Sequence, residues 1–135
     1  MPHISKTPLP DKELANLFDQ FNHLIARLDQ SQSAAFFSEL LGPEEQIQLT
    51  KRLAAVVMFI EGNSSYRVAQ LLQLSPSTAE RIRRDFMAGR YDASTQFLTQ
   101  SKTEYEEFWR VLDVILRAGL PPRGRGRWKS VFSRP

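Results

Sequence analysis

A short stretch of the chain combines hydroxyl and guanidinium side chains in an order that suits an anionic partner. Hydroxyl residues come first, and long arginines follow within two helical turns. Both groups donate hydrogen bonds to phosphate oxygens, and arginine also matches the acceptor edge of guanine. The residues expected to face outwards and enter a major groove are Ser75, Ser77, Thr78, Glu80, Arg81 and Arg84. Arg67 and Arg83 are expected to touch phosphate.

Apolar residues around this stretch follow the spacing of two short crossing helices. Counted from Ser65, they occupy the fourth, eighth, tenth, fifteenth and eighteenth places, and a small alanine takes the fifth. These residues are Val68, Ala69, Leu72, Leu74, Ala79 and Ile82. The spacing predicts a helix-turn-helix over residues 65–84, with 76–87 as its second helix. The alternative is an amphipathic hairpin in an ordinary helical bundle.

Local chemistry supports the second helix. Ser75 is expected to cap it, Pro76 suits its first position, and Ser77 with Glu80 offers a second capping box. The turn residue departs from the usual pattern, because Gln73 stands where glycine is common. A left-handed conformation at this residue costs roughly 1 kcal/mol.

The rest of the sequence predicts further helices and no strand. Expected helices span residues 11–28, 34–41, 43–61 and 103–118, with a short helix around 94–98. Their starts are assigned to Asp11, to Ser33 and to a capping box of Thr103 with Glu106. Residues 43–61 are apolar on most sides, which predicts a central helix. The fold class is therefore all-α, with about six helices.

The two ends of the chain differ in composition from its middle. Residues 1–10 carry three prolines and predict a flexible arm, and 11–118 form the expected domain. The chain has a net charge of +3, yet no acid follows Asp113, so 119–135 is a basic tail. Its cations include Arg123, Arg125, Arg127 and Lys129. Residues 122–127 resemble an AT-hook core, which fits a narrow minor groove. The alternatives are non-specific phosphate contacts and a solubilising tail.

The sequence lacks the residues that several classes of protein function require. There is no cysteine, and the two histidines, His3 and His23, have no metal-ligand spacing. We find no nucleophile with a base beside it and no phosphate-binding glycine loop, so an enzyme is not expected. No metal or cofactor is expected either. No apolar run is long enough to span a membrane, and the N-terminus lacks a signal-peptide core. The expected location is the cytoplasm, on the nucleoid.

Residues 36–88 resemble the Trp repressor superfamily. The marks of the resemblance are Leu41, Pro43 and Glu45 at a helix start, Arg52 nine residues after that proline, Gly62, and the helix-turn-helix itself. The resemblance implies an all-helical homodimer with interlocked helices, each subunit presenting one helix-turn-helix to half of an operator. The wide apolar stripe between Leu14 and Leu28 is what such a dimer would bury.

The resemblance also implies an effector pocket in which two arginines enclose L-tryptophan. Those arginines would be Arg52 and Arg81. Two positions depart from the family pattern: Gly42 stands where a hydroxyl residue is expected, and Ile82 where glycine leaves room for the ligand. The alternative is that Arg52 pairs with an acid on a neighbouring helix and Arg81 contacts DNA.

Two functions follow from these patterns. The first is a sequence-specific transcriptional regulator, a repressor, that binds double-stranded DNA as a homodimer and reads the major groove with residues 76–87. Its basic tail adds phosphate or minor-groove contacts. The second is a helical adaptor that binds another protein and uses the tail to hold nucleic acid. Duplex affinity after removal of Arg81 and Arg84 discriminates between them.

Overall fold

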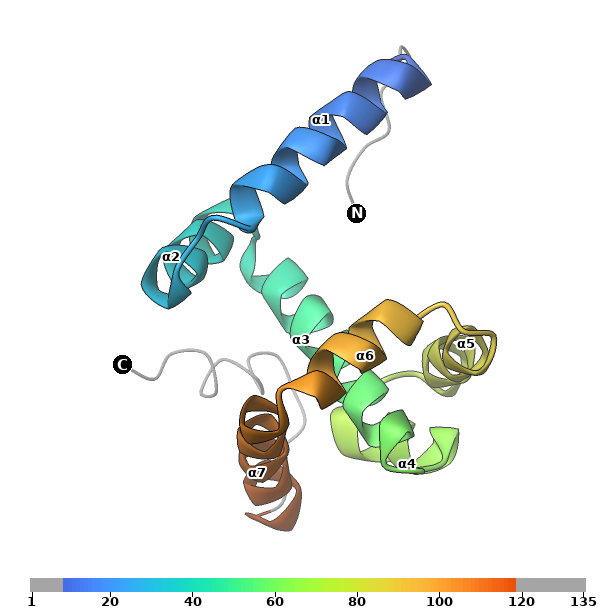
Figure 1. Ribbon diagram of the computed structural model, residues 1–135. Coiled ribbons are helices and arrows are strands. Elements are labelled where there is room, and N and C mark those ends of the chain that lie inside the picture. The colour runs from blue at the N-terminus through green and yellow to red at the C-terminus, as the bar shows by residue number, and fades with distance from the viewer. Residues whose placement is uncertain (1–8, 119–135) are drawn as a thin grey trace. The chain divides into compact units, whose positions relative to one another are not determined.

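The computed structural model describes residues 9–118, and within that range every regular element is a helix (Figure 1). The helices are α1 (Asp11–Ile25), α2 (Gln30–Leu40), α3 (Pro43–Ile60), α4 (Ser65–Leu72), α5 (Pro76–Met87), α6 (Asp92–Gln100) and α7 (Lys102–Ala118). The all-α prediction is confirmed. The described range holds seven helices, and about six were expected. The short helix expected around 94–98 extends over residues 92–100.

The chain divides into two compact units, one up to Pro43 and one from Glu44 on. In the first unit, Pro10 occupies the cap of α1 without a side-chain hydrogen bond, so Asp11 is a helical residue and not the predicted cap. The helix ends at Ile25, three residues before the predicted end at Leu28. The following residues close shorter turns, with the Leu28 N–H donating to the Ile25 carbonyl at 3.1 Å.

The start of α2 corrects a second expectation. Asp29, and not Ser33, caps this helix. The Asp29 carboxylate accepts from the Gln32 N–H at 2.7 Å, and the Gln32 side chain accepts from the Asp29 N–H at 3.1 Å. This reciprocal capping box satisfies two backbone donors at once and therefore outcompetes a lone serine further along.

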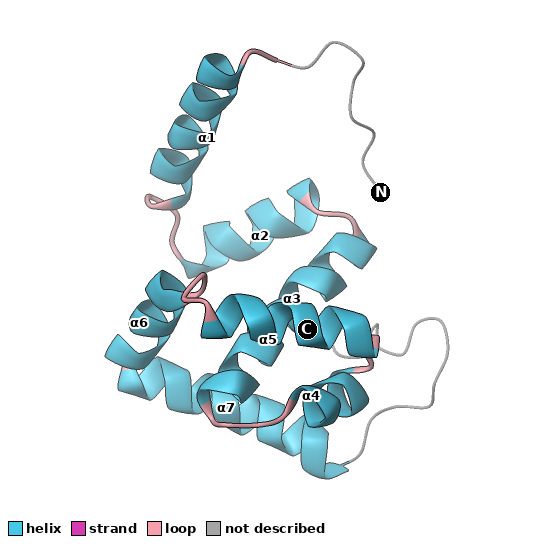
Figure 2. Cartoon of the chain, turned by 90° about the vertical axis from the view of Figure 1, so that its right-hand side faces the viewer, coloured by secondary structure: helices cyan, strands magenta, loops and turns pink. Residues whose placement is uncertain are grey.

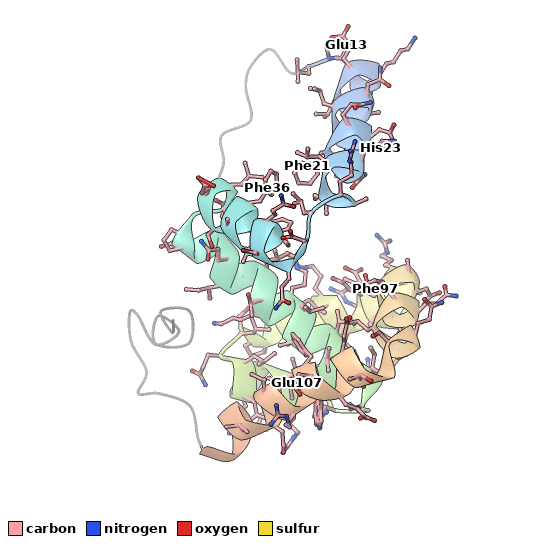
Figure 3. The ribbon with its side chains drawn as sticks, turned by 60° about the vertical axis from the view of Figure 1, so that its left-hand side comes forward. Glu13, Phe21, His23, Phe36, Phe97 and Glu107 are labelled. Carbon is pink, nitrogen blue, oxygen red and sulfur yellow. The ribbon has the colours of Figure 1, made fainter. Side chains whose placement is uncertain are left out.

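Aromatic side chains join α1 to α2. The ring centroids of Phe21 and Phe36 lie 6.1 Å apart, and these side chains face each other in Figure 3. Even so, neither helix has a buried residue. Leu17 is 58% exposed and Phe18 is 63% exposed. The apolar stripe of α1 is thus left largely uncovered within its unit.

The second unit is built around α3, as predicted. Six consecutive residues of α3, from Ala54 to Phe59, are buried. The other helices of the unit add Val68, Ala69, Leu72, Ala79, Ile82 and Leu112 to this core. Towards its start α3 is more exposed than its pattern indicates, since Leu49 is 52% and Leu53 36% exposed. Within residues 9–118, no helix combines the length and apolar character needed to cross a membrane.

Glycines in the left-handed region end α3 and α5. Gly62 has φ +87° and Gly89 has φ +84°. Beyond each glycine, an N–H returns to a carbonyl of the last turn: Asn63 to Met58 at 3.0 Å, and Arg90 to Asp85 at 2.9 Å. Glycine adopts this conformation without the steric penalty of a Cβ, so both helices stop sharply.

The final helix begins one residue earlier than expected. α7 starts at Lys102, so Thr103 lies inside its first turn and the predicted capping box with Glu106 is not at the helix start. The Tyr105 hydroxyl donates to the Glu61 carboxylate at 2.8 Å. This bond fixes the beginning of α7 against the end of α3.

Candidate nucleic-acid interface

The helices α4 and α5 pack as a pair joined by a three-residue turn (Figure 2). The apolar residues predicted to face inwards do so. Val68, Leu72, Ala79 and Ile82 are at most 5% exposed, Ala69 is also buried, and Leu74 is half-buried. The pair therefore has its own apolar contact and belongs to the main core.

The turn holds its non-glycine residue in the left-handed region, as predicted. Gln73 has φ 57° and ψ 49°. Four hydrogen bonds surround it. The Gln73 and Leu74 N–H groups both donate to the Ala69 carbonyl, the second at 3.0 Å. The Gln73 amide side chain donates to the Gln70 carbonyl at 2.7 Å, and the Lys51 ammonium donates to the Gln73 carbonyl at 3.2 Å. These bonds offset the roughly 1 kcal/mol that the conformation costs.

Hydroxyl groups cluster at the N-terminus of α5. The Ser75 Oγ accepts from the Thr78 N–H at 3.1 Å and donates to the Thr78 Oγ1 at 2.8 Å, which confirms Ser75 as the cap. Ser77 Oγ lies 3.2 Å from Ser75 Oγ. Ser77 is inside the helix, so the second capping box with Glu80 does not form a helix start. The positive end of the helix dipole lies at this cluster and favours an anion nearby.

Arg81 and Arg84 are exposed on α5, and Arg67 is exposed near the start of α4. The two acids of α5 are occupied by other cations. Glu80 lies 3.5 Å from Arg83, and Asp85 lies 3.6 Å from Arg90. Within residues 9–118, no carboxylate forms an ion pair with Arg81 or Arg84. Their charges are thus not neutralised by an ion pair within residues 9–118.

An open hollow of about 710 Å³ lies beside α5, lined by the exposed side of α4 and the start of α5. Tyr66 and Gln70 contribute from α4, and Ser75 and Glu80 contribute from the other side. Tyr66 is 75% exposed. Polar donors and acceptors therefore continue from the start of α5 onto α4.

The two arginines of the expected effector pocket share a smaller cavity. Arg52 and Arg81 line a space of about 140 Å³ together with Ile82, Asp85 and Tyr91. Small-molecule sites typically measure about 300–1,000 Å³. Among the described residues, no acid forms an ion pair with Arg52, so its expected pairing with a neighbouring helix is not seen.

The predicted cations of the tail, Arg123, Arg125, Arg127 and Lys129, lie outside the described residues. In the described part of the chain, no group of three or more His, Asp or Glu side chains could hold a metal ion.

Residues 47–95 match the family model of a homeodomain-like domain. The matched segment contains most of α3 and all of α4 and α5, so it includes the helix-turn-helix in full. This match supports a helix-turn-helix DNA-binding fold and covers less than half of the chain. It does not single out the Trp repressor superfamily, which stays a prediction. No curated protein and no solved structure matches the chain significantly.

Lys51 is the residue of this region that the sequence patterns missed. Lysine normally marks a solvated position, and its neighbours Thr50 and Arg52 are polar as well. A signal was nevertheless present, because Lys51, Ala55 and Met58 lie on one face of α3 at helical spacing. All three are buried.

Proposed function

We propose that the chain is a sequence-specific DNA-binding regulator, a repressor, that reads the major groove with α5. The observation that carries the proposal is the contrast between the two sides of this helix. Ala79 and Ile82 fix its inner side in the core, while Arg81 and Arg84 extend from it exposed and without ion pairs in residues 9–118. A helix anchored in this way carries its guanidinium groups at a defined angle to the duplex.

Phosphate contacts surround the reading helix in this proposal. Arg67 and Arg83 contact the backbone, and the hydroxyl cluster of Ser75 and Thr78 adds hydrogen bonds from the positive end of α5. The basic tail at 119–135 contributes through Arg123, Arg125, Arg127 and Lys129. Deleting the tail is expected to lower the slope of log affinity against log salt by about one for each lost phosphate contact.

We assign Arg81 to DNA rather than to an effector. The cavity that it shares with Arg52 measures about 140 Å³, and the branched Ile82 side chain lines it. The small volume and the position of Ile82 both argue against the binding of an indole ring between the two arginines.

We also propose that the protein acts as a homodimer. The uncovered stripe of α1 supports this, since Leu14, Leu17, Phe18 and Leu24 are each at least 49% exposed. Patches of this kind commonly mark protein interfaces. A two-fold dimer binds a palindromic operator whose half-sites lie roughly 34–36 Å, one helical turn, apart.

The test is selection of bound duplexes from a random library with the full-length protein. We expect an enriched palindromic motif, and no enrichment would reject the proposal. Arg81→Ala with Arg84→Ala should abolish enrichment. The matched control, Arg27→Ala with Arg110→Ala, removes the same charge from exposed positions outside the helix-turn-helix and should keep the motif.

A protein-interaction adaptor is the second candidate, favoured by exposed apolar side chains on α6 and α7. Phe97, which Figure 3 labels, is 69% exposed, and Val111 and Val114 are 53% and 61% exposed. An adaptor predicts that duplex affinity stays unchanged in the Arg81→Ala/Arg84→Ala variant.

A further inference from the structure

A lysine is buried next to the turn between α4 and α5. Lys51 on α3 is only 9% exposed and is the one charged side chain buried among the described residues. Removing an ammonium group from water is costly unless hydrogen bonds compensate for it. One of its contacts is the bond from its Nζ to the Gln73 carbonyl, at 3.2 Å.

The carbonyl that accepts from Lys51 belongs to Gln73, whose backbone conformation is uncommon for a residue with a side chain. Among the described residues, Gln73 is the only non-glycine with positive φ. Two residues later the chain enters the cap of α5 at Ser75. A rotation of the backbone at Gln73 would therefore displace the N-terminal end of α5, because only Leu74 lies between Gln73 and the cap.

We infer that Lys51 is a positioning residue, which holds the left-handed turn so that α5 meets the DNA groove at one angle. It touches no DNA itself, and it acts through the Gln73 backbone. The inference rests on the proposed function and adds to it: the specificity of α5 depends on a cation buried on α3. Losing that cation leaves the exposed arginines in place and Ala79 and Ile82 in the core, but it loosens the turn that sets the position of the N-terminal end of α5.

A double-variant cycle tests this mechanism. Lys51→Met keeps the length of the apolar stem and removes the donor, and Gln73→Gly removes the conformational penalty that the donor offsets. We expect Lys51→Met to speed hydrogen exchange at the Leu74 amide about tenfold, because the bond that restrains the turn is lost. Affinity for the selected operator should fall about tenfold, with little change for random-sequence duplex.

Adding Gln73→Gly should restore most of both losses, because glycine adopts the left-handed conformation without the steric penalty that the Lys51 bond offsets. A core-packing role would behave differently. Lys51→Met would then weaken binding to selected and random duplexes alike, and Gln73→Gly would rescue neither, which would overturn the inference. Lys12→Met, an exposed helical lysine, serves as the matched control and should change neither readout.

The outcomes stay informative if the single variant does not fold. In that case, a folded Lys51→Met/Gln73→Gly protein supports the inference and an unfolded one overturns it. Hydrogen exchange is measured on the free protein, so it is independent of DNA. A protein that selects no motif but shows the exchange pattern would reject the proposed function and leave the role of Lys51 in the turn intact.

Discussion

The Tyr105 hydroxyl donates to the Glu61 carboxylate at 2.8 Å, across 44 residues of sequence. Glu61 directly precedes the left-handed Gly62, which ends α3 and leads into α4. The bond thus links α7 to the point where the chain enters the helix-turn-helix. Burial first, and then the hydrogen bond and negative charge of Glu61, raise the pKa of Tyr105 above its usual value.

Tyr105→Phe is expected to lower the free energy of unfolding at pH 7 by about 1 kcal/mol, the net value of a typical hydrogen bond. Because the folded-state pKa is the higher one, this contribution is complete below about pH 10, where tyrosine ionises in the unfolded chain. It is lost as the pH rises from there towards the folded-state pKa. Urea unfolding of both proteins at pH 7 and pH 11 measures the difference, which should shrink at pH 11.

The matched control is Tyr66→Phe, since Tyr66 is 75% exposed and should leave stability unchanged at both pH values. A difference between wild type and Tyr105→Phe that stays constant or grows with pH would contradict the linkage.

Ser75→Ala removes the cap of α5 and is expected to cost about 1 kcal/mol of stability. The loss arises because the Thr78 N–H, now at 3.1 Å from Ser75 Oγ, loses its acceptor. Thermal unfolding checks this. Ser77→Ala, two residues further in and exposed, should stay within about 0.5 kcal/mol of wild type. Equal losses for the two variants would show that the cap is not the cause.

Glu80→Ala is expected to change base preference rather than abolish binding. In the proposed function, the Glu80 carboxylate would accept from the amino group of cytosine, and such contacts are worth about 1–3 kcal/mol of discrimination. Motif selection should show lost cytosine preference at one position of each half-site. Affinity for random duplex should rise, because a negative charge near the phosphates is removed. Asp85→Ala is the control, and a motif identical to wild type for Glu80→Ala would exclude this role.

Leu17→Ser with Phe18→Ser should convert a dimer to monomer. Burying an apolar side chain contributes about 1.5–3 kcal/mol, so the dimer dissociation constant should rise on the order of a hundredfold or more. Sedimentation equilibrium measures it, with Val111→Ser/Val114→Ser on α7 as the control. A wild-type protein that sediments as a monomer, or a dimer that only the α7 variant disrupts, would refute the assignment to α1.

The helix-turn-helix could be predicted because its apolar residues must meet at fixed places. Two short helices can cross in only a few ways if they must bury Val68, Leu72, Ala79 and Ile82 against each other. The starts of α2 and α7 were predicted wrongly because several residues in each region could serve as a cap. Asp29 caps α2 in place of Ser33 because it exchanges two hydrogen bonds with Gln32. The sequence permits this pair of bonds but does not require it.

Lys51 shows a different limit of sequence reading. Its long apolar stem suits the core and its ammonium needs hydrogen-bond acceptors, and one of these is a backbone carbonyl 22 residues away. A carbonyl has no signature in the sequence, since every residue has one. Only the packing of α3 against the turn reveals the contact.

The ion pairs formed by the two acids of α5 bear on whether this helix could be transplanted into another protein. Glu80 finds Arg83 and Asp85 finds Arg90, so each acid is matched by a cation at most five positions away. The partners of both acids are therefore contained within residues 80–90. If residues 75–90 were grafted onto an unrelated helical scaffold, both ion pairs and the exposed Arg81 and Arg84 would be transferred with them. The new scaffold would have to provide the packing that orients the helix.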